Sequence, residues 1–382
     1  MVRRIAVLGC TGSVGVNALD ILRRHPDRFE VSALVANRSA DALAAQCAEH
    51  SPKAACLVGG GARPATLPTG SEWFEGEAGL IECLDSTDPD LVLNAITGAA
   101  GLPVTEWALR NGKTLALANK ESLVMAGEYL MPLAQRTGAT ILPVDSEHCA
   151  LFQCFNGEPR ERLRRIWLTA SGGPFRTRDA STFGAITPAE ALKHPTWDMG
   201  PRITIGSATL MNKGFEILEA HWLFGLKEDE IEVLVHPQSI VHSMVEFCDG
   251  SILAQLGVPD MRVPILYCLS WPDRLPFGDF EPFHPQKFAE LNFEPVDRQK
   301  FPTVDLAFEC LRRGGDSGAV LNAADEVLTQ AFLDGEVAFP DIPALVAEVL
   351  RSRDPRPIAS LDDVRAADRE AREAARAAIA AR

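Results

Sequence analysis

The sequence lacks any uninterrupted apolar run of about 18 residues, the length that a membrane-spanning helix requires. Its N-terminal apolar run, Ile5 to Leu8, is short and is followed at once by glycines, so it predicts a strand entering a turn and not a signal peptide. The nine cysteines are scattered and form no C-x-x-C pair. This pattern argues against a zinc knuckle or a disulfide framework and favours reduced thiols in a cytoplasm.

Positive charge is also scarce. The chain has 37 lysines and arginines against 52 aspartates and glutamates, which gives a net charge of −15. This balance argues against a nucleic-acid partner or an anionic membrane surface, but it leaves room for a small basic pocket that binds an anionic small molecule. The length of 382 residues exceeds one ordinary core and predicts two or three domains.

Short β-like runs alternate with helical segments through the first 138 residues. This alternation predicts a parallel sheet with helices on both faces, which is an α/β fold with an N-terminal Rossmann-like domain over 1–138. The expected strands are 5–8, 31–35, 54–58, 91–96 and 114–118, and helices are expected at 17–24 and 40–49.

The pattern changes after residue 138. Strand-like runs at 140–144, 165–169, 231–235, 240–247 and 251–256 predict a central α+β catalytic domain over 139–270, with a hairpin at Cys248-Asp249-Gly250. The prolines at 272, 276, 282 and 285 predict an extended linker over 271–299. Helical periodicity predicts a C-terminal helical bundle over 300–382, whose last helix begins at Ser360 with a capping box to Asp363.

Glycines punctuate the segment Gly9-Cys10-Thr11-Gly12-Ser13-Val14-Gly15, which follows a strand and precedes a helix. At such a junction the backbone can approach a pyrophosphate, whose charge faces the free N–H groups of the helix start. The spacing is G-x-x-G-x-x-G and not the common G-x-G-x-x-G, so a tight turn that binds nothing remains an alternative.

The second expected strand ends in Asn37-Arg38-Ser39 and not in the acid that an NAD site usually places there. An arginine with two small polar residues suits a 2′-phosphate, so a dinucleotide bound at this turn would be NADPH. The alternative is that Arg38 is a solvated loop charge.

Two acids, Asp145 and Glu147, stand two residues apart where a strand ends. In a strand their side chains would project to one face, and two such close anions need a proton or a cation between them. Carboxylate oxygens without cysteine suit Mg²⁺ or Mn²⁺, with a third ligand from Glu216 or Glu219, between which spacing does not choose. A plain acidic strand end and a glycosidase carboxylate pair remain alternatives.

Anion-binding groups occur in two further segments. Ser171 precedes two glycines, and Ser207, Asn212 and Lys213 lie within one helical neighbourhood, a set of donors that suits a phosphate monoester. Between them, the loop 194–201 carries Trp197 and predicts a lid over the site, although a packed surface loop would look similar.

Two histidines, His236 and His242, could be considered as zinc ligands. They lack an acid or a cysteine at a suitable spacing, so packed or supporting roles are favoured for both.

Eight segments in this order closely resemble the 1-deoxy-D-xylulose 5-phosphate reductoisomerase family, which acts in the non-mevalonate isoprenoid pathway. The resemblance runs nearly end to end. It rests on GCTGSVG, ANKESLV (118–124), PVDSEH (143–148), SGGPF (171–175), HPTWDMG (194–200), SATLMNKGFE (207–216), HPQSIVHSMVEF (236–247) and LAQLGVPDMRVPI (253–265).

The resemblance implies a role for each matching residue. NADPH would contact Thr11, Gly12, Ser13, Val14, Asn37, Arg38, Ser39, Asn119, Glu121 and Gly200. A divalent cation, Mn²⁺ or Mg²⁺, would be bound by Asp145, Glu147 and Glu216, which selects Glu216 over Glu219. The phosphorylated substrate would contact Lys120, Ser146, Glu147, Ser171, His194, Ser207, Asn212, Lys213 and Glu216, and Trp197 and Met199 would belong to a flexible lid.

The implied reaction is a metal-dependent rearrangement and NADPH reduction of 1-deoxy-D-xylulose 5-phosphate to 2-C-methyl-D-erythritol 4-phosphate by a homodimer. Lys120, Asp145, Glu147 and Glu216 would be the catalytic residues. Two other functions remain as alternatives: an NADPH-dependent dehydrogenase of another phosphorylated small molecule, and a protein that binds NADPH without a reaction.

The chain departs from the family pattern at two places. An aspartate commonly precedes the serine that matches Ser207, whereas this chain has Gly206, which predicts a looser phosphate side. The family's 2′-phosphate loop is commonly Gly-Lys-Asn, and here it is Asn37-Arg38-Ser39, which keeps a cation.

Overall fold

The computed structural model describes residues 2–155, 157–194, 197, 200–276, 281 and 283–382. They form two compact units that interleave along the chain. The first lies within Met1–Asn119, Pro132–Cys149 and Asp260–Gly278, and the second within Lys120–Met131, Ala150–Pro259 and Asp279–Arg382. In this described part, every helix is too short or too polar to cross a membrane.

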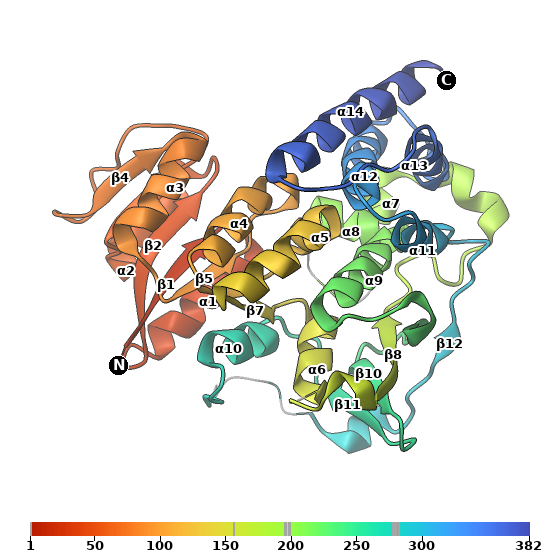
Figure 1. Cartoon of the computed structure of the whole chain (residues 1–382), viewed down its shortest axis with the longest axis horizontal. Helices are drawn as coiled ribbons and strands as arrows, with labels where there is room; N and C mark the ends of the chain where they lie inside the picture. Colours follow the sequence, from red (N-terminus) through yellow and green to blue (C-terminus); the bar gives the residue numbers. More distant parts are fainter. Residues whose placement is uncertain (1, 156, 195–196, 198–199, 277–280, 282) are drawn as a thin grey trace. The chain divides into compact units, whose positions relative to one another are not determined.

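The first unit contains a seven-stranded sheet with the strand order β4-β3-β2-β1-β5-β6-β7 (Figure 1). All six neighbouring pairs are parallel. The strands are β1 (Arg3–Leu8), β2 (Phe29–Ala36), β3 (Ala54–Leu57), β4 (Glu72–Glu75), β5 (Leu91–Asn94), β6 (Thr114–Leu117) and β7 (Thr140–Pro143).

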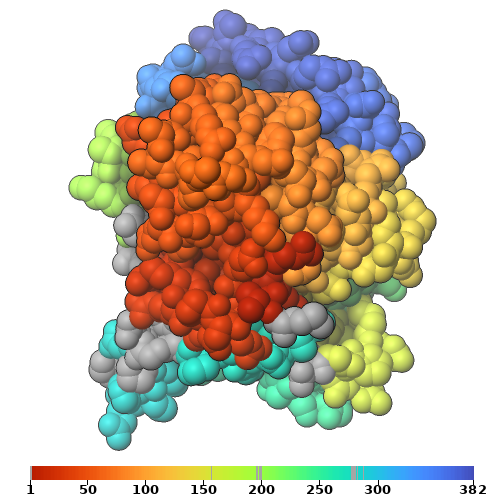
Figure 2. All heavy atoms as spheres, turned by 90° about the vertical axis from the view of Figure 1, so that its left-hand side faces the viewer, coloured from red at the N-terminus to blue at the C-terminus, as the bar shows by residue number. Residues whose placement is uncertain are grey.

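The central strands of this sheet are nearly continuous apolar runs because both of their faces are covered. Residues 5–8 of β1 and all of β5 are fully buried. The crossover helices are α1 (Ser13–Arg24), α2 (Ala40–His50), α3 (Gly76–Thr87) and α4 (Leu102–Arg110), and α10 (Arg262–Ser270) packs against α1. Figure 2 shows the side of the molecule on which β4 and α3 lie. The red and orange atoms form a continuous surface there.

Strand β1 lies between β2 and β5. The chain adds β2, β3 and β4 on one side of β1 and then β5, β6 and β7 on the other side, so the strand order reverses at β1. In parallel sheets of this kind, ligands bind beyond the carboxyl ends of the strands at the reversal point. The glycine turn that follows Leu8 leaves β1 at this end. The predicted Rossmann-like fold is therefore confirmed, and it places the candidate phosphate turn where a dinucleotide is expected.

The second unit contains a five-stranded mixed sheet with the order β11-β10-β8-β9-β12. Its strands are β8 (Leu163–Ala170), β9 (Ile231–Val235), β10 (Val241–Phe247), β11 (Ile252–Leu256) and β12 (Glu294–Pro295). Strands β10 and β11 pair antiparallel across the turn at 248–250, which confirms the predicted hairpin.

Helices form the rest of the second unit and share one apolar core with the sheet. Among them, α12 packs against α8, α13 and α14, and α9 packs against α8 and α11. Ser360 and Asp363 form the predicted capping box of α14. The helices are α7 (Pro188–Ala191), α8 (Pro201–Ala208), α9 (Met211–Phe224), α11 (Thr303–Arg313), α12 (Ser317–Leu333), α13 (Asp341–Arg351) and α14 (Leu361–Ala380).

Two helices contain residues of both units, namely α5 (Lys120–Thr137), which is kinked at Ala126, and α6 (Ser146–Phe155). The compact units therefore do not have the bounds 1–138, 139–270, 271–299 and 300–382, and that division by function stays a prediction.

Three elements differ from the sequence-based expectation. The strand expected at 140–144 was assigned to the second domain, but β7 pairs with β6 in the first sheet. Strand β4 was not predicted, because Glu72-Trp73-Phe74-Glu75 is a short edge strand with exposed acids at both ends. Within the predicted linker, β12 pairs with β9, so part of that segment belongs to the second sheet; Pro282 lies outside the described residues.

Candidate active site

The turn after β1 is shaped by two glycines that contact neighbouring backbone. A Cβ on Gly9, whose φ is +79°, would lie 2.5 Å from the carbonyl oxygen of Ala95, and a Cβ on Gly15 would lie 2.4 Å from the carbonyl oxygen of Gly9. Helix α1 begins at Ser13 after Gly12, a residue without a side chain to cap it. Its first N–H groups are therefore available to an anion.

The residues expected at the pyrophosphate, Thr11 to Val14, lie on this turn and are exposed or half-buried. The segment expected at the 2′-phosphate, Asn37-Arg38-Ser39, is exposed at the carboxyl end of β2. A Cβ on Gly59 would lie 2.7 Å from the carbonyl oxygen of Asn37, so the neighbouring loop packs closely against this segment. Arg38 thus lies directly after β2, the strand that pairs with β1.

Asn119 joins two loops at the same edge of the first sheet. Its Nδ2 donates to the carbonyl oxygens of Ile96, at 2.7 Å, and Gly98, at 2.9 Å. The side chain is buried and packs so closely on Gly101 that a Cβ there would lie 2.6 Å from the Asn119 Cγ. Asn119 therefore holds the loop after β5 against the loop after β6.

Asp145 and Glu147 lie at a junction between a strand and a helix. Strand β7 ends at Pro143 and α6 begins at Ser146, so the expected projection of both acids from one strand face is wrong. The Oδ1 of Asp145 accepts the N–H of Glu147 at 3.1 Å, which is the bond of a helix-capping aspartate. The Oγ of Ser146 donates to Glu147 Oε2 at 2.7 Å.

His148 is a neighbour of this carboxylate that sequence reasoning did not select. It is fully buried, and its Nδ1 lies 3.0 Å from Asp145 Oδ1. A buried ring in this place fixes the orientation of the Asp145 carboxylate, as outer contacts of metal ligands commonly do. Its spacing of three residues from Asp145 was the available signal, but only with α6 starting at Ser146 does that spacing bring the two side chains together.

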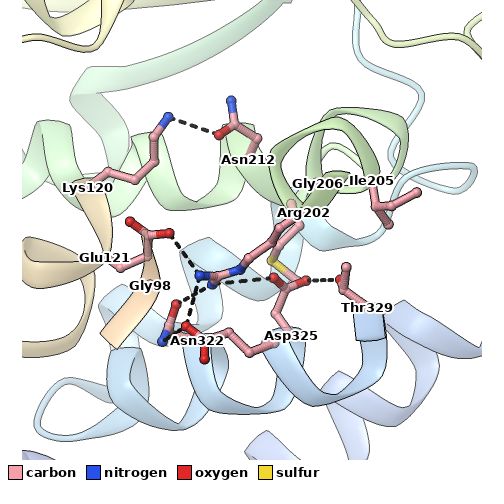
Figure 3. A network of polar contacts seen from close by, with 12 residues as sticks. Gly98, Lys120, Glu121, Arg202, Ile205, Gly206, Asn212, Asn322, Asp325 and Thr329 are labelled. Carbon is pink, nitrogen blue, oxygen red and sulfur yellow. Dashed lines mark hydrogen bonds and ion pairs between the residues drawn. The ribbon is translucent and has the colours of Figure 1, made fainter. Parts of the chain in front are cut away.

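In the second unit, Glu216 of α9 is almost completely buried among nitrogen donors. Its Oε1 accepts from Lys120 Nζ at 3.1 Å and from Asn212 Nδ2 at 2.6 Å, and its Oε2 is ion-paired with Lys213. Figure 3 shows Lys120 also donating to Asn212 Oδ1, at 2.9 Å. Two ammonium groups around one carboxylate leave positive charge for an anionic ligand.

Glu219, the alternative to Glu216, is also fully buried and lies one helical turn further along α9. The contacts with Lys120, Asn212 and Lys213 are made by Glu216. Of these contacts, the one with Lys120 is tertiary, and spacing along the sequence does not reveal it.

His194 links Ser171 and Ser207. Its Nε2 lies 3.1 Å from Ser171 Oγ and 3.0 Å from Ser207 Oγ, while its Nδ1 accepts the backbone N–H of Trp197 at 2.9 Å. Burial lowers the pKa of His194 to about 4, so the ring is neutral at pH 7. A Cβ on Gly173, whose φ is +67°, would lie 2.6 Å from the carbonyl oxygen of Ser207, so this glycine allows the loop to approach α8.

The remaining expected residues have different surroundings. Glu121 forms an ion pair with Arg202, at 2.9 Å, and Gly200 is exposed directly before α8. Met199 of the expected lid lies outside the described residues, as do Pro195, Thr196 and Asp198.

Both histidines for which packed roles were predicted are buried and bonded to backbone carbonyl oxygens. His236 Nδ1 lies 2.8 Å from the oxygen of Asn292, and His242 Nε2 lies 3.2 Å from the oxygen of Gly257.

Comparisons with known proteins identify relatives along nearly the whole chain. Family models match residues 5–127 ("1-deoxy-D-xylulose 5-phosphate reductoisomerase"), 141–224 ("1-deoxy-D-xylulose 5-phosphate reductoisomerase C-terminal domain") and 256–374 ("DXP reductoisomerase C-terminal domain"). The 1-deoxy-D-xylulose 5-phosphate reductoisomerase of Cupriavidus metallidurans is 49% identical over 99% of this chain and 98% of its own. That of Xanthomonas axonopodis pv. citri is also 49% identical, over 99% and 97%.

Solved structures agree with these matches. A 1-deoxy-D-xylulose 5-phosphate reductoisomerase from Zymomonas mobilis in complex with NADPH has a TM-score of 0.92 and 44% identity, and the match covers 99% of each chain. A reductoisomerase in complex with NADPH, fosmidomycin and magnesium has a TM-score of 0.90 and 38% identity, over 99% of this chain and 98% of the other. The chain belongs to the 1-deoxy-D-xylulose 5-phosphate reductoisomerase family.

Proposed function

We infer that the chain converts 1-deoxy-D-xylulose 5-phosphate to 2-C-methyl-D-erythritol 4-phosphate with NADPH and a divalent cation. The observation that carries this function is the polar cluster around Glu216 of α9, which is surrounded by Lys120 of α5 and by Asn212 and Lys213 of α9, in a chain that matches this family nearly end to end. The cluster offers amide and ammonium groups to a phosphorylated sugar and a carboxylate to a cation.

NADPH binds at the first unit. The glycine turn and the start of α1 present N–H groups to the pyrophosphate, and Arg38 supplies a cation for the 2′-phosphate. Glu121 and Gly200 are assigned to the cofactor on the family resemblance, and so is Asn119. The solved relatives bound to NADPH support the choice of cofactor.

The carboxylates of Asp145, Glu147 and Glu216 are proposed to hold a divalent cation. The donor set fits Mg²⁺ or Mn²⁺, because it consists of hard carboxylate oxygens, Glu216 is buried, and the Asp145 carboxylate is fixed by His148. Relatives were solved with magnesium. When bound, the cation supplies Lewis acidity to the substrate's vicinal oxygens and stabilises developing negative charge.

The protein's own groups bind and orient the substrate. Ser171, Ser207, Asn212 and Lys213 are assigned to the phosphate, with His194 holding the two serines. Ser146 is assigned to the sugar hydroxyls, and Lys120, beside Glu216, stabilises developing negative charge. Binding energy from the remote phosphate closes a lid that contains Trp197 and excludes water.

The reaction has two parts. The carbon skeleton of the substrate breaks and rejoins, in a retro-aldol and aldol sequence, to give a branched aldehyde phosphate. A hydride from NADPH then adds to the aldehyde carbon, and a proton adds to its oxygen. NADPH is oxidised and the aldehyde is reduced to an alcohol, so the electrons balance.

The enzyme is proposed to be a cytoplasmic homodimer in which β11 pairs with β11 of a second copy. This strand is at the edge of its sheet and exposes Ile252 (52%), Leu253 (48%) and Leu256 (40%). An apolar edge strand is a template for strand pairing, and an antiparallel edge meets its own copy with two-fold symmetry. Replacing Leu253 by Lys should give a monomer in light scattering, whereas a variant that remains dimeric would reject this interface.

The function is tested by following NADPH oxidation with 1-deoxy-D-xylulose 5-phosphate, with and without Mn²⁺. We expect oxidation that requires both the substrate and the metal. A dehydrogenase of another phosphorylated compound would not oxidise NADPH with this substrate, and a protein that only binds NADPH would oxidise none. Either result would reject the proposed reaction.

A further inference from the structure

One guanidinium joins the start of α8 to two other helices of the second unit. Arg202 is the second residue of α8, and its nitrogens lie 2.9 Å from Glu121 Oε1, 2.8 Å from Glu326 Oε1 and 2.8 Å from Asn322 Oδ1. Asp325 Oδ2 lies 4.0 Å away. Figure 3 shows the guanidinium between Glu121 of α5 and the side chains of Asn322 and Asp325 on α12.

The same helix carries a proposed substrate group at its other end. Ser207 is the seventh residue of α8 and bonds to His194. At about 1.5 Å per residue, Arg202 and Ser207 are separated by about 7.5 Å along the helix axis, so a tilt at the start of α8 displaces Ser207. Glu121 directly follows Lys120, which contacts Glu216.

Stability alone does not explain this cluster. Glu121, Asp325 and Glu326 bring three carboxyl groups around Arg202, and a second arginine, Arg372 of α14, is ion-paired with Glu326 and lies 2.7 Å from Asp368. Burial raises the pKa of Asp325 to about 7, against the opposing effect of Arg202, so this site disfavours its charge. Buried charge networks contribute little net stability, because desolvation offsets the attraction between the charges. What such a network does provide is a fixed geometry.

We propose that Arg202 is a positioning residue for the substrate pocket: by holding the start of α8 against α5 and α12, it sets the position of Ser207 and therefore of His194. Arg202 acts through these residues and is not assigned a contact with substrate. The inference rests on the proposed function, because it concerns the pocket to which the substrate's phosphate is assigned.

The test compares Arg202→Met with Arg372→Met. The two arginines share Glu326 as a partner, but Arg372 reaches it from α14. Arg202→Met should raise the KM for 1-deoxy-D-xylulose 5-phosphate by about tenfold to a hundredfold, with a smaller change in kcat, since small displacements of binding groups have effects of this size. It should also speed the hydrogen exchange of the α8 amides from Thr204 to Ala208. Arg372→Met should leave both quantities close to wild type even if its melting temperature falls.

The proposal is overturned if Arg202→Met leaves the substrate KM and α8 exchange unchanged, or if Arg372→Met changes both equally. If Arg202→Met does not fold, Arg202→Lys replaces it: one ammonium cannot reproduce the guanidinium's contacts, so a smaller rise in KM and in exchange is expected, and no change in either overturns the proposal.

The measurement of hydrogen exchange needs no turnover. A wild-type enzyme without activity would therefore reject the function, while exchange would still decide the role of Arg202.

Discussion

The Nε2 of His194 lies 3.0 Å from the Oγ of Ser207. Because Nδ1 of the same ring accepts the N–H of Trp197, the proton of the neutral imidazole is on Nε2 and is directed at the serine oxygens. A serine that accepts this bond keeps its own hydroxyl proton to donate. His194 therefore arranges Ser171 and Ser207 as neighbouring donors, which suits an anionic group such as a phosphate.

Neutral His194 predicts a pH dependence of stability. The folded ring has a pKa of about 4 and an unfolded one about 6.5, so between these values the unfolded chain binds a proton that the folded chain does not. The neutral His194 ring therefore contributes its full stabilisation of the folded state above about pH 6.5, and this stabilisation is lost as the pH falls toward 4. Urea unfolding should show that wild type loses more stability between pH 7 and pH 4.5 than His194→Asn does. Equal losses would contradict the neutral, buried ring.

Glu216→Gln tests the proposed metal ligand. Glutamine keeps the size of the side chain but removes the charge that a cation needs, so turnover should fall by at least about a hundredfold, as when one contact to developing charge is lost. NADPH binding, measured by fluorescence titration, should remain close to wild type.

Glu219→Gln is the matched control for that change, because Glu219 is equally buried on the same helix, one turn away. Its turnover should stay within a few-fold of wild type in any preparation that folds. Near-normal turnover in Glu216→Gln, or an equal loss in Glu219→Gln, would reject the choice of Glu216.

Arg38→Glu tests whether Arg38 contacts the 2′-phosphate of NADPH. The substitution places an anion where the 2′-phosphate of NADPH is expected, whereas NADH has a hydroxyl there. The KM for NADPH should rise by at least about tenfold more than that for NADH, which corresponds to about 1.4 kcal/mol. An equal change for both cofactors would show that Arg38 does not contact the 2′-phosphate.

Gly206→Ala tests whether the glycine of α8 is needed for space. A Cβ at Gly206 would lie 3.5 Å from its nearest neighbour, the backbone nitrogen of Asn212, which is an ordinary contact. Alanine should therefore raise the free energy of unfolding by about 0.5–1 kcal/mol, because it restricts the unfolded chain and favours the helix. Chemical denaturation measures this difference.

Gly15→Ala is the opposite case, since its Cβ would lie 2.4 Å from the Gly9 carbonyl oxygen. This variant should lose stability and NADPH affinity together. If Gly206→Ala is the more damaging of the two, the packing around α8 differs from that described.

Much of the first unit could be predicted because its strands are short apolar runs that alternate with helices. The sequence reveals less about which sheet a strand joins. The run at 140–144 would suit either sheet, and only its pairing with β6 shows that it belongs to the first sheet. For Asp145 and Glu147, the assumption of a strand whose side chains two residues apart share one face was wrong. The aspartate is better understood as a cap on α6, a signal that was present in Asp145 followed by a helical pattern.

The site residues were selected through resemblance, and the contacts among them required the fold. No spacing predicts that positions 121, 202 and 322 meet, because the three residues come from separate helices. For the same reason Arg202 was missed, because its place is set by tertiary packing. His148 lies only three residues from Asp145, and it was missed because a helix starting at Ser146 was not predicted.

Product analysis after incubation of the enzyme with 1-deoxy-D-xylulose 5-phosphate, Mn²⁺ and NADPH deuterated at the transferred position distinguishes the proposed reaction from the alternatives. We predict 2-C-methyl-D-erythritol 4-phosphate with one deuterium on the carbon that was the aldehyde, as read by NMR and mass spectrometry. Recovery of unrearranged substrate, or of an unbranched reduced product, would contradict the proposed reaction.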